Sequence, residues 1–316
     1  MHLIKFNTKF DFIGKGKYAV LLSAVAIILS IVSLGMGNLT FGIDFTGGVV
    51  VHVQYPHDVN LGEVRGALDK AGYDRRVVQH FGSANTALIR LPVSAAASDI
   101  KTTEIGKEVM AALKSGPPNA QLQSVEFIGP QAGSELVNKG GLALLYTMIA
   151  MLIYVIFRFH WKLATGAILA LVHDSIITLG IFSLTDMDFD LTVLAALLTI
   201  IGYSINDTIV VFDRIRENFP RMRKATPIEV ANAAINQTLS RTVITSGVTL
   251  LAVLALFLLG GQTLHGFSFA LLVGIVVGTY SSIFVASALA LRLKLTAQDL
   301  FPPKEEDVDR ASHSTR

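Results

Sequence analysis

Six long apolar runs leave this sequence few choices of fold. Each run is close to the roughly 20 residues that an α-helix, rising about 1.5 Å per residue, needs to cross about 30 Å of hydrocarbon. Of the 316 residues, 52% are hydrophobic and 16% are charged, whereas ordinary soluble domains are roughly 25% charged. The sequence therefore predicts an α-helical polytopic membrane protein with six transmembrane helices, at 18–37, 141–158, 162–184, 191–212, 241–260 and 266–291.

The first apolar run also has features of a secretory signal peptide, because Lys15 and Lys17 precede it. Two observations argue against cleavage. The run is long, and no A-x-A-like site follows Leu39. We therefore expect an uncleaved membrane anchor.

Lysine and arginine gather on alternate loops. Arg158 and Lys162 lie between the second and third runs, whereas the short loops around Asp186 and Gln262 contain neither residue type. Cytoplasmic loops retain positive charge, so both termini are predicted to be cytoplasmic. The predicted divisions are a cytoplasmic N-terminus at 1–17, the first helix at 18–37, an extracytoplasmic domain at 39–139, a five-helix bundle at 141–291 with a cytoplasmic loop at 213–240, and a cytoplasmic tail at 292–316.

The segment 39–139 has the pattern of a small α/β domain. Alternating β-formers are separated by stretches with helical spacing, in the order β-α-β-β-α-β, which is the ferredoxin-like arrangement. His52, His57 and His80 are dispersed, so a binding module is indicated and no catalytic constellation is visible. The predicted strands are 48–55, 75–82, 86–93 and 121–128, and the predicted helices are 61–71 and 99–114.

The cytoplasmic loop contains its own helix start. Thr226 is a capping residue, Pro227 suits the first helical position and Glu229 completes a capping box. This pattern predicts an interfacial helix over 227–239. Beyond Phe301 the tail is charged and contains proline, and we expect it to be disordered.

Composition narrows the classes of function. The net charge of +2 is too small to indicate a nucleic-acid partner, and the absence of cysteine excludes disulfides and thiolate metal sites. We expect no metal, no cofactor and no enzymatic activity. The lipid bilayer is the one partner that composition itself predicts.

Three ionisable residues lie inside the apolar runs: Asp174, Asp207 and Arg241. A charge near the bilayer centre costs about 2.5–3.5 kcal/mol even on insertion scales, so such residues are usually functional. The fourth run leads inward and the fifth outward. Asp207 and Arg241 therefore both fall in the cytoplasmic half of the membrane, at depths that permit a pair.

Each of these residues has a functional and a structural interpretation. A buried carboxylate near an arginine is suited to proton passage. In the structural interpretation, Asp207 is a static salt-bridge or hydrogen-bond partner that fixes helix packing, and the Arg241 side chain extends to the cytoplasmic membrane interface. The role of Asp174 stays open, and His173 is expected to be a packing or hydrogen-bonding residue. Gly274 and Gly278 form a small-xxx-small pattern that indicates close helix packing.

Five sequence motifs together are typical of one known family. They are FGIDFTGG at 41–48, VHD at 172–174, IIGYSINDTIVVFDRIREN at 200–218, LSRT at 239–242 and GTYSS at 278–282. On these motifs the chain resembles the SecF family, whose members are subunits of the SecD–SecF accessory complex of the bacterial Sec protein translocase, within the resistance-nodulation-division-like superfamily. The resemblance spans residues 1 to about 300.

The resemblance implies that the chain is half of a transporter fold, with SecD supplying the other half in the bacterial inner membrane. Together they would use the proton motive force to draw unfolded precursor proteins outward, after the SecYEG channel and the SecA motor, and with YajC as a further partner. In the family pattern Asp207 matches the aspartate of the proton path and Arg241 the arginine beside it, and we expect Asp174 on the same path. Residues 41–48 match the motif at the entry to the outer domain.

For three residues of that entry motif a structural interpretation is favoured. Gly47 and Gly48 permit a tight strand entry, and Asp44 is expected to cap or to bond backbone.

Three other functions fit parts of the sequence. A proton-coupled exporter of small molecules or lipids would share the fold, but such pumps usually carry both halves in one chain. An intramembrane aspartyl protease would use Asp174 and Asp207 as a dyad, although the Gly-x-Gly-Asp signature is absent because Ser204 and Asn206 occupy its place. A non-catalytic assembly subunit differs only in not needing Asp207 for proton flux.

Overall fold

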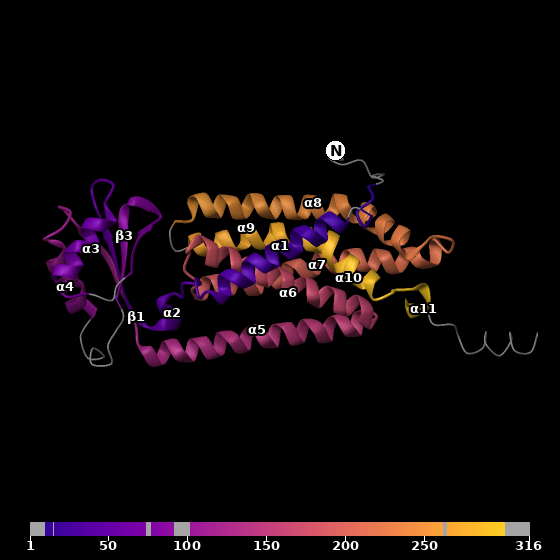
Figure 1. Ribbon diagram of the computed structural model, residues 1–316, viewed down its shortest axis with the longest axis horizontal. Helices are drawn as coiled ribbons and strands as arrows, with labels where there is room; N and C mark the ends of the chain where they lie inside the picture. The colour runs from indigo at the N-terminus through magenta and orange to yellow at the C-terminus, as the bar shows by residue number, and fades with distance from the viewer. Residues whose placement is uncertain (1–9, 15, 74–76, 92–101, 262–263, 301–316) are drawn as a thin grey trace, which may run out of the picture.

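The structure is an elongated two-part molecule with a sheet domain at one end and a bundle of long helices at the other (Figure 1). It is a computed structural model, and it describes residues 10–14, 16–73, 77–91, 102–261 and 264–300. The start of the first long helix and the last short helix lie at the end of the bundle away from the sheet domain (Figure 1). The tail beyond Phe301, predicted to be disordered, lies outside the described residues.

Within the described residues, six helices are long and apolar enough to cross a membrane, which confirms the six predicted spans. The last span contains a π-helical turn, η3 (Ser282–Ala286), between two α-helical parts, and a short helix, α11 (Ala297–Leu300), follows it. The spans are α1 (Gly16–Gly35), α5 (Pro130–Arg158), α6 (Trp161–Thr185), α7 (Leu191–Arg221), α8 (Pro227–Leu259), and α9 (His265–Ser281) with its continuation through η3 and α10 (Ser287–Arg292).

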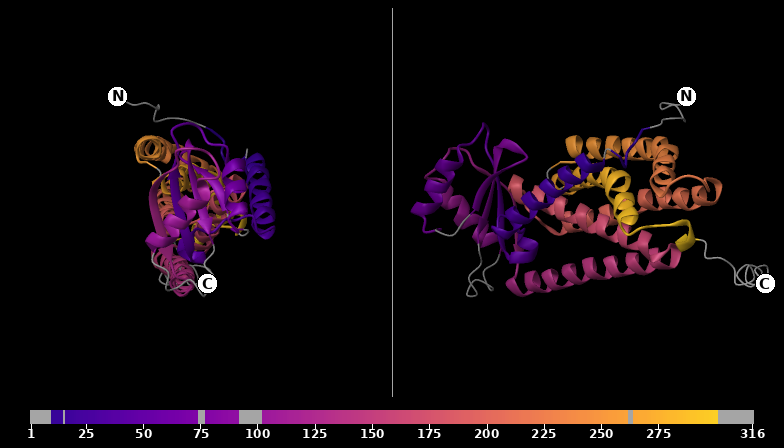
Figure 2. Two further views of the ribbon diagram at one scale, coloured as in Figure 1. Left: turned by 90° about the vertical axis from the view of Figure 1, so that its left-hand side faces the viewer. Right: turned by 45° about the vertical axis from the view of Figure 1, so that its right-hand side comes forward.

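The helices form an inner and an outer set. About half of the residues in the spans of α6, α7 and α9 are buried, whereas only 6% are buried in α5, which runs along one side of the bundle (Figures 1 and 2). A Cβ atom on Gly274 would lie 2.3 Å from Ile200, and one on Gly278 would lie 3.0 Å from Ser204. These glycines therefore let α9 approach α7 closely, as the small-xxx-small pattern predicts.

The first helix is built with its polar side inward. Its buried residues are only Gly16, Ser23, Ser30 and Ser33, while its large apolar residues are exposed. Ser33 is bonded to Ser183 on α6, with 2.7 Å between the two Oγ atoms. A helix that buries serine and exposes leucine and valine has the pattern of a lipid-facing segment, because lipid rather than water surrounds its outer face.

Three helix boundaries differ from the sequence prediction. The interfacial helix expected at 227–239 and the span expected at 241–260 are one helix, α8, which starts with the predicted capping box of Thr226 and Glu229. No proline interrupts α8 after Pro227, and its first turns pack through Val230 and Ala234 into the buried core, so nothing ends the helix at the membrane surface. Two other helices are longer than predicted: α5 begins at Pro130, before the predicted start at 141, and α7 continues to Arg221, beyond the predicted end at 212.

The sheet domain has the ferredoxin-like topology predicted from the sequence. Its four strands are antiparallel in the order β2-β3-β1-β4, with both helices of the domain between them in sequence (Figure 1). The elements are β1 (Gly48–Gln54), α3 (Leu61–Lys70), β2 (Val77–Phe81), β3 (Ser83–Leu91), α4 (Thr102–Leu113) and β4 (Gln121–Ile128).

Successive side chains of β1 point to opposite faces of the sheet. Val49, Val51 and Val53 belong to the buried core that includes Leu68 of α3 and Val109 of α4. Residues of the other face line a cleft of about 1200 Å³ together with the α6–α7 loop and the start of α9. The open face of the sheet therefore looks toward the helix bundle.

The entry motif at 41–48 fastens the sheet domain to α7. Its short helix α2 (Ile43–Thr46) carries Asp44, whose Oδ2 accepts a hydrogen bond of 2.9 Å from the backbone N–H of Leu191 in the first turn of α7. A carboxylate there is favourable because the N-terminus of a helix carries partial positive charge. Gly47 has φ 66° and Gly48 has φ 139°, and a Cβ on Gly48 would lie 2.9 Å from the Leu91 carbonyl oxygen. The structural interpretation of Asp44, Gly47 and Gly48 agrees with these contacts.

A buried ion pair makes the second connection between the two parts. Arg90 on β3 pairs with Asp188 in the α6–α7 loop, and their side chains are 11% and 20% exposed. Gln79 Nε2 donates to Asp188 Oδ2 at 3.0 Å, and Arg90 Nη1 donates to the carbonyl oxygen of Phe41 at 3.2 Å. Burial raises the pKa of Asp188, and the neighbouring Arg90 opposes that rise.

Removing one partner of this ion pair should loosen the sheet domain from the bundle. We expect Arg90→Met to leave Asp188 buried without its cation, at a cost of up to about 3 kcal/mol, and the double change Arg90→Met with Asp188→Leu to recover most of that cost. Hydrogen exchange at the backbone amides of Gly42 and Phe189, which bond across the junction, measures this directly.

The exposed pair Arg214–Glu217, with side chains 39% and 51% exposed, supplies the matched control. Arg214→Met should change stability by less than about 1 kcal/mol and should not alter exchange at the junction. Unchanged exchange at Gly42 and Phe189 in Arg90→Met would show that the ion pair does not hold the domain.

Candidate functional site

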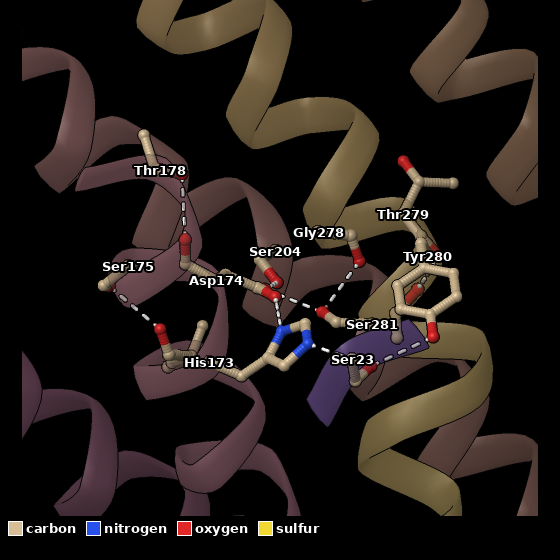
Figure 3. Close-up of polar contacts among 12 residues, drawn as sticks. Ser23, His173, Asp174, Ser175, Thr178, Ser204, Gly278, Thr279, Tyr280 and Ser281 are labelled. Carbon is tan, nitrogen blue, oxygen red and sulfur yellow. Dashed lines mark hydrogen bonds and ion pairs between the residues drawn. The ribbon is translucent and has the colours of Figure 1, made fainter. Parts of the chain in front are cut away.

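A polar cluster lies in the core of the bundle around Asp174 on α6 (Figure 3). Asp174 is 1% exposed. Its Oδ2 accepts hydrogen bonds from Ser204 Oγ on α7 at 2.6 Å and from Ser281 Oγ on α9 at 2.7 Å. Its Oδ1 lies 2.9 Å from Nδ1 of His173. Three helices therefore meet at one buried carboxylate.

The cluster continues from His173 to the first helix. His173 Nε2 lies 3.1 Å from Ser23 Oγ on α1, and Ser23 Oγ lies 3.0 Å from the hydroxyl of Tyr280 on α9. The Tyr280 hydroxyl also donates to the carbonyl oxygen of Ala19 at 2.6 Å. The result is an unbroken chain of polar contacts from Asp174 to α1 (Figure 3).

Asp207 on α7 belongs to a second, sparser cluster. It is 4% exposed, and its Oδ2 accepts a long hydrogen bond of 3.4 Å from Ser246 Oγ on α8. Ser246 Oγ lies 2.8 Å from Thr279 Oγ1 and 3.4 Å from the Tyr203 hydroxyl. In the described part of the chain, Asp207 thus has one weak hydroxyl donor, Ser246, which is itself bonded to further hydroxyl groups.

The pairing of Asp207 with Arg241 that the sequence permits is not formed among the residues that the structure describes. Arg241 lies exposed on α8 and attracts the carboxylate only at longer range. The hydroxyl of Ser246, one turn and a residue further along α8, occupies the contact instead. Within the same described part of the chain, Asp174 and Asp207 have no hydrogen bond to each other, so the geometry of an aspartyl dyad is not present.

Several members of the Asp174 cluster were not singled out by sequence reasoning. Ser23, Ser204, Ser281 and Tyr280 contact the His173–Asp174 pair, and His173 is confirmed as a hydrogen-bonding residue. Serine in a membrane helix often bonds only to a carbonyl of its own helix, so the residue type alone does not reveal a contact between helices. The motifs at 200–218 and 278–282 contain three of these four residues, which was the available signal.

Chemically, the two clusters can hold and exchange protons. Among the described residues, neither Asp174 nor Asp207 is in contact with a lysine or arginine. A buried carboxylate held by hydroxyls can take up or release a proton without breaking a strong ion pair, whereas one fixed to an arginine cannot.

Comparison with known proteins shows which family this chain is similar to. Residues 108–296 match the family described as "Protein export membrane protein SecD/SecF, C-terminal". The protein translocase subunit SecF of Vibrio alginolyticus is 48% identical over 96% of this chain and 96% of its own length, and that of Pseudomonas aeruginosa is 49% identical over 90% and 92%.

A solved structure shares the fold. SecDF from Thermus thermophilus, described as a translocon-associated membrane protein, matches with a TM-score of 0.83 and 38% identity over 92% of this chain. This chain spans 40% of the length of that protein. The match includes the membrane helices and agrees with a half-transporter architecture. The chain therefore belongs to the SecF family of protein translocase subunits.

Proposed function

We propose that this translocase subunit works with SecD to use the proton motive force in completing protein export through the SecYEG channel. The observation that carries the proposal is the burial of Asp174 and Asp207 in the membrane bundle, where hydroxyls donate to both carboxylates and no lysine or arginine of the described residues contacts either one. Carboxylates in that setting are suited to changing protonation state as helices shift. SecA, YajC and unfolded precursor proteins complete the proposed set of partners.

The proposed proton path includes Asp207, Arg241 and Asp174. Asp207 has the less complete set of hydrogen-bond donors of the two carboxylates, and Arg241 lies exposed one helix away. A movement that brings Arg241 toward Asp207 would favour the ionised carboxylate, and its withdrawal would favour protonation. Such a cycle gives a proton-coupled transport subunit with no reaction chemistry of its own.

The need for SecD follows from the exposed surfaces of the bundle. Large apolar residues of α5 and α8, including Tyr146, Ile153, Val248 and Leu251, are half or more exposed. In the solved SecDF protein, 60% of the chain lies outside the part that this chain matches. We propose that SecD covers part of the surface and lipid covers the rest.

The proposed location is the bacterial inner membrane, with both termini cytoplasmic and the sheet domain outside. The support is the distribution of charge over the two ends of the bundle. The sheet domain and the lysine-free α6–α7 loop are at one end of the bundle, and the start of α1, the end of α5 and the start of α6 are at the other (Figure 1). Those three helix ends carry Lys17, Arg158 and Lys162. Positive charge marks the cytoplasmic side.

Single cysteines test this orientation cleanly, because the chain has none of its own. Ser115→Cys in the sheet domain should react with a membrane-impermeant maleimide in intact cells, and Lys224→Cys between α7 and α8 should react only after lysis. Both positions are exposed, so accessibility does not bias the comparison. The reverse labelling pattern would refute the orientation and the outer position of the sheet domain.

Substitutions at Asp207 test the proton role. Asp207→Asn keeps the size of the side chain and removes the titratable group, so gradient-dependent export should fall to the level seen with a collapsed gradient while SecD binding persists. Arg241→Met should also reduce export, because the carboxylate loses the attraction of the Arg241 cation. Precursor release from proteoliposomes with and without a proton gradient measures both effects.

Asp186→Asn, an identical chemical change in an exposed loop, is the control and should leave export unchanged. A static role for Asp207 predicts a different pattern. Single changes would lower the amount of folded complex, and Asp207→Asn combined with Arg241→Met would restore both folding and gradient-dependent export. Restored export in that double variant would rule out Asp207 as a proton carrier.

A further inference from the structure

We propose that His173 and Asp174 together hold one exchangeable proton, and that release of this proton breaks a hydrogen bond between α1 and α9. The existence of the proton follows from counting hydrogen-bond donors in the cluster of Figure 3. Only its use in export rests on the proposed function.

The count starts at Tyr280, which has one hydroxyl proton and two close oxygen neighbours. The Ala19 carbonyl oxygen, at 2.6 Å, has no proton to offer, so the Tyr280 proton points to it. The 3.0 Å contact between Tyr280 and Ser23 then needs the proton of Ser23. Since Ser23 has one proton as well, its oxygen must act as acceptor toward His173 Nε2 at 3.1 Å. Nε2 therefore carries a proton.

That assignment fixes the charge of the His173–Asp174 pair. With Nε2 protonated, the 2.9 Å contact between Nδ1 and Asp174 Oδ1 contains one further proton. The pair is then either an imidazolium with a carboxylate or a neutral imidazole with a carboxylic acid. Both forms have zero net charge, which is what a nearly water-free site with 4% and 1% exposed residues favours.

The groups around the pair are compatible with both forms. Ser204 on α7 and Ser281 on α9 donate to Asp174 Oδ2, an oxygen that accepts in either state. Tyr280 is the titratable side chain that faces the pair from α9, and on the described part of α1 the pair meets the hydroxyl of Ser23. Within those described surroundings no lysine, arginine or second carboxylate contacts either residue.

Release of the proton changes the contact between helices. The pair is then a neutral imidazole and a carboxylate, and the remaining ring proton moves to Nδ1, where Asp174 accepts it. Nε2 becomes an acceptor, so Ser23 must turn its single proton from Tyr280 to His173. The hydrogen bond from Ser23 on α1 to Tyr280 on α9 is lost, whereas Tyr280 still donates to the Ala19 carbonyl oxygen on α1. Because α1 leads into the entry motif of the sheet domain, the protonation state of the pair changes a contact of a helix that connects to that domain.

Nitrogen NMR of the full chain in lipid bilayers tests the count without any transport assay. The chain has eight histidines, so a difference spectrum against His173→Gln isolates the His173 ring. At neutral pH we expect a protonated Nε2. Tyr280→Phe frees the Ser23 proton for Nε2, and we expect the unprotonated fraction of Nε2 to rise at the same pH. Tyr203→Phe, which removes a hydroxyl bonded to Ser246 and Thr249, should change nothing at His173.

An unprotonated Nε2 in the unsubstituted chain, or a Tyr280→Phe spectrum identical to that of Tyr203→Phe, would overturn the proposal. A transport assay distinguishes a failure of this proposal from a failure of the proposed function. If the NMR results are as expected and Asp174→Asn still exports precursor in a gradient-dependent way, the proton count stands and the placement of Asp174 on the export path is wrong.

A separate observation, at the opposite end of the bundle from the sheet domain, carries a second inference. A crevice of about 590 Å³ lies between the starts of α1 and α8 and the end of α10. We infer that it binds an anionic phospholipid, with the headgroup phosphate held by three basic residues and an acyl chain along its apolar wall. This inference is independent of proton coupling.

The basic side of the crevice is formed by Lys17, Arg292 and Lys294. Within the described residues, none of the three is in an ion pair. The carboxylates of Asp11 and Glu229 belong to the same region and accept backbone hydrogen bonds of 2.7 Å from Gly14 and Thr226. The three basic side chains outnumber these two carboxylates, so the crevice has a net positive charge.

The other side of the crevice is apolar, and this distinguishes a lipid from a soluble anion. Val20, Ile228 and Leu291 line it, beside helix ends where lipid headgroups meet the hydrocarbon. Tyr18, 67% exposed at the start of α1, is the residue type that gathers at that depth. Basic pockets between membrane helices are recognised sites for acidic headgroups.

Native mass spectrometry of the full chain with phosphatidylglycerol or phosphatidylcholine tests the site. The unsubstituted chain should retain more phosphatidylglycerol than phosphatidylcholine. A triple variant should reduce the retention of phosphatidylglycerol about tenfold; it combines Lys17→Gln, Arg292→Gln and Lys294→Gln. The control replaces Arg221, Arg223 and Lys224 by Gln, which removes the same charge from exposed positions at the same end of the bundle. Ala288→Phe should fill the apolar part and also reduce retention without changing charge.

Three results would overturn the lipid assignment. They are equal retention by the triple variant and its control, equal binding of phosphatidylcholine, and displacement of the lipid by inorganic phosphate at millimolar concentration. Lipid binding that appears only after truncation following Leu300 would identify the chain's own tail as the occupant and would equally overturn the assignment.

Discussion

The solvation of one carboxylate by hydroxyls from neighbouring helices is the interaction on which the bundle core depends. Asp174 remains buried because Ser204 and Ser281 reach its Oδ2, and they reach it only where α6, α7 and α9 approach closely. Gly278 provides that approach, since a Cβ there would lie 3.0 Å from Ser204. Hydrocarbon offers no alternative partner for the carboxylate, so helix packing and carboxylate solvation stabilise each other.

This core is connected to the sheet domain by two continuous helices. α1 carries Ser23 in the cluster and ends just before the entry motif, while α7 carries Ser204 and begins at Leu191, where Asp44 of that motif accepts a hydrogen bond. The Arg90–Asp188 pair adds a side-chain tie between β3 and the loop that leads into α7. A displacement of either helix in the core is therefore transmitted to a domain that is held at several points, and does not dissipate in a flexible linker.

Much of this architecture could be predicted from the sequence, because hydrophobic periodicity and length decide membrane spans and strands alike. The six spans, the β-α-β-β-α-β order and the capping box at Thr226 are local properties and were predicted. The continuity of α8 was not, since the polarity change near Arg241 indicates a membrane boundary but not a helix boundary. The partners of Asp174 were also missed. Contacts such as His173 to Ser23 join residues 150 positions apart. How two helices align along each other cannot be predicted from the sequence of either helix alone.

The two buried aspartates differ in how completely this chain solvates them, and the difference suits a subunit that functions with a partner. Asp174 has two short hydroxyl bonds and a histidine, all from within the chain. Among the described residues Asp207 has one donor at 3.4 Å, and Arg241, whose charge acts on it, is exposed on α8. A carboxylate that is incompletely solvated in an isolated half must gain its remaining partners from water, from Arg241 or from the other half. In the proposed complex Asp207 is therefore the group whose surroundings change with assembly and movement, whereas the His173–Asp174 pair already has hydrogen-bond partners on α1, α7 and α9.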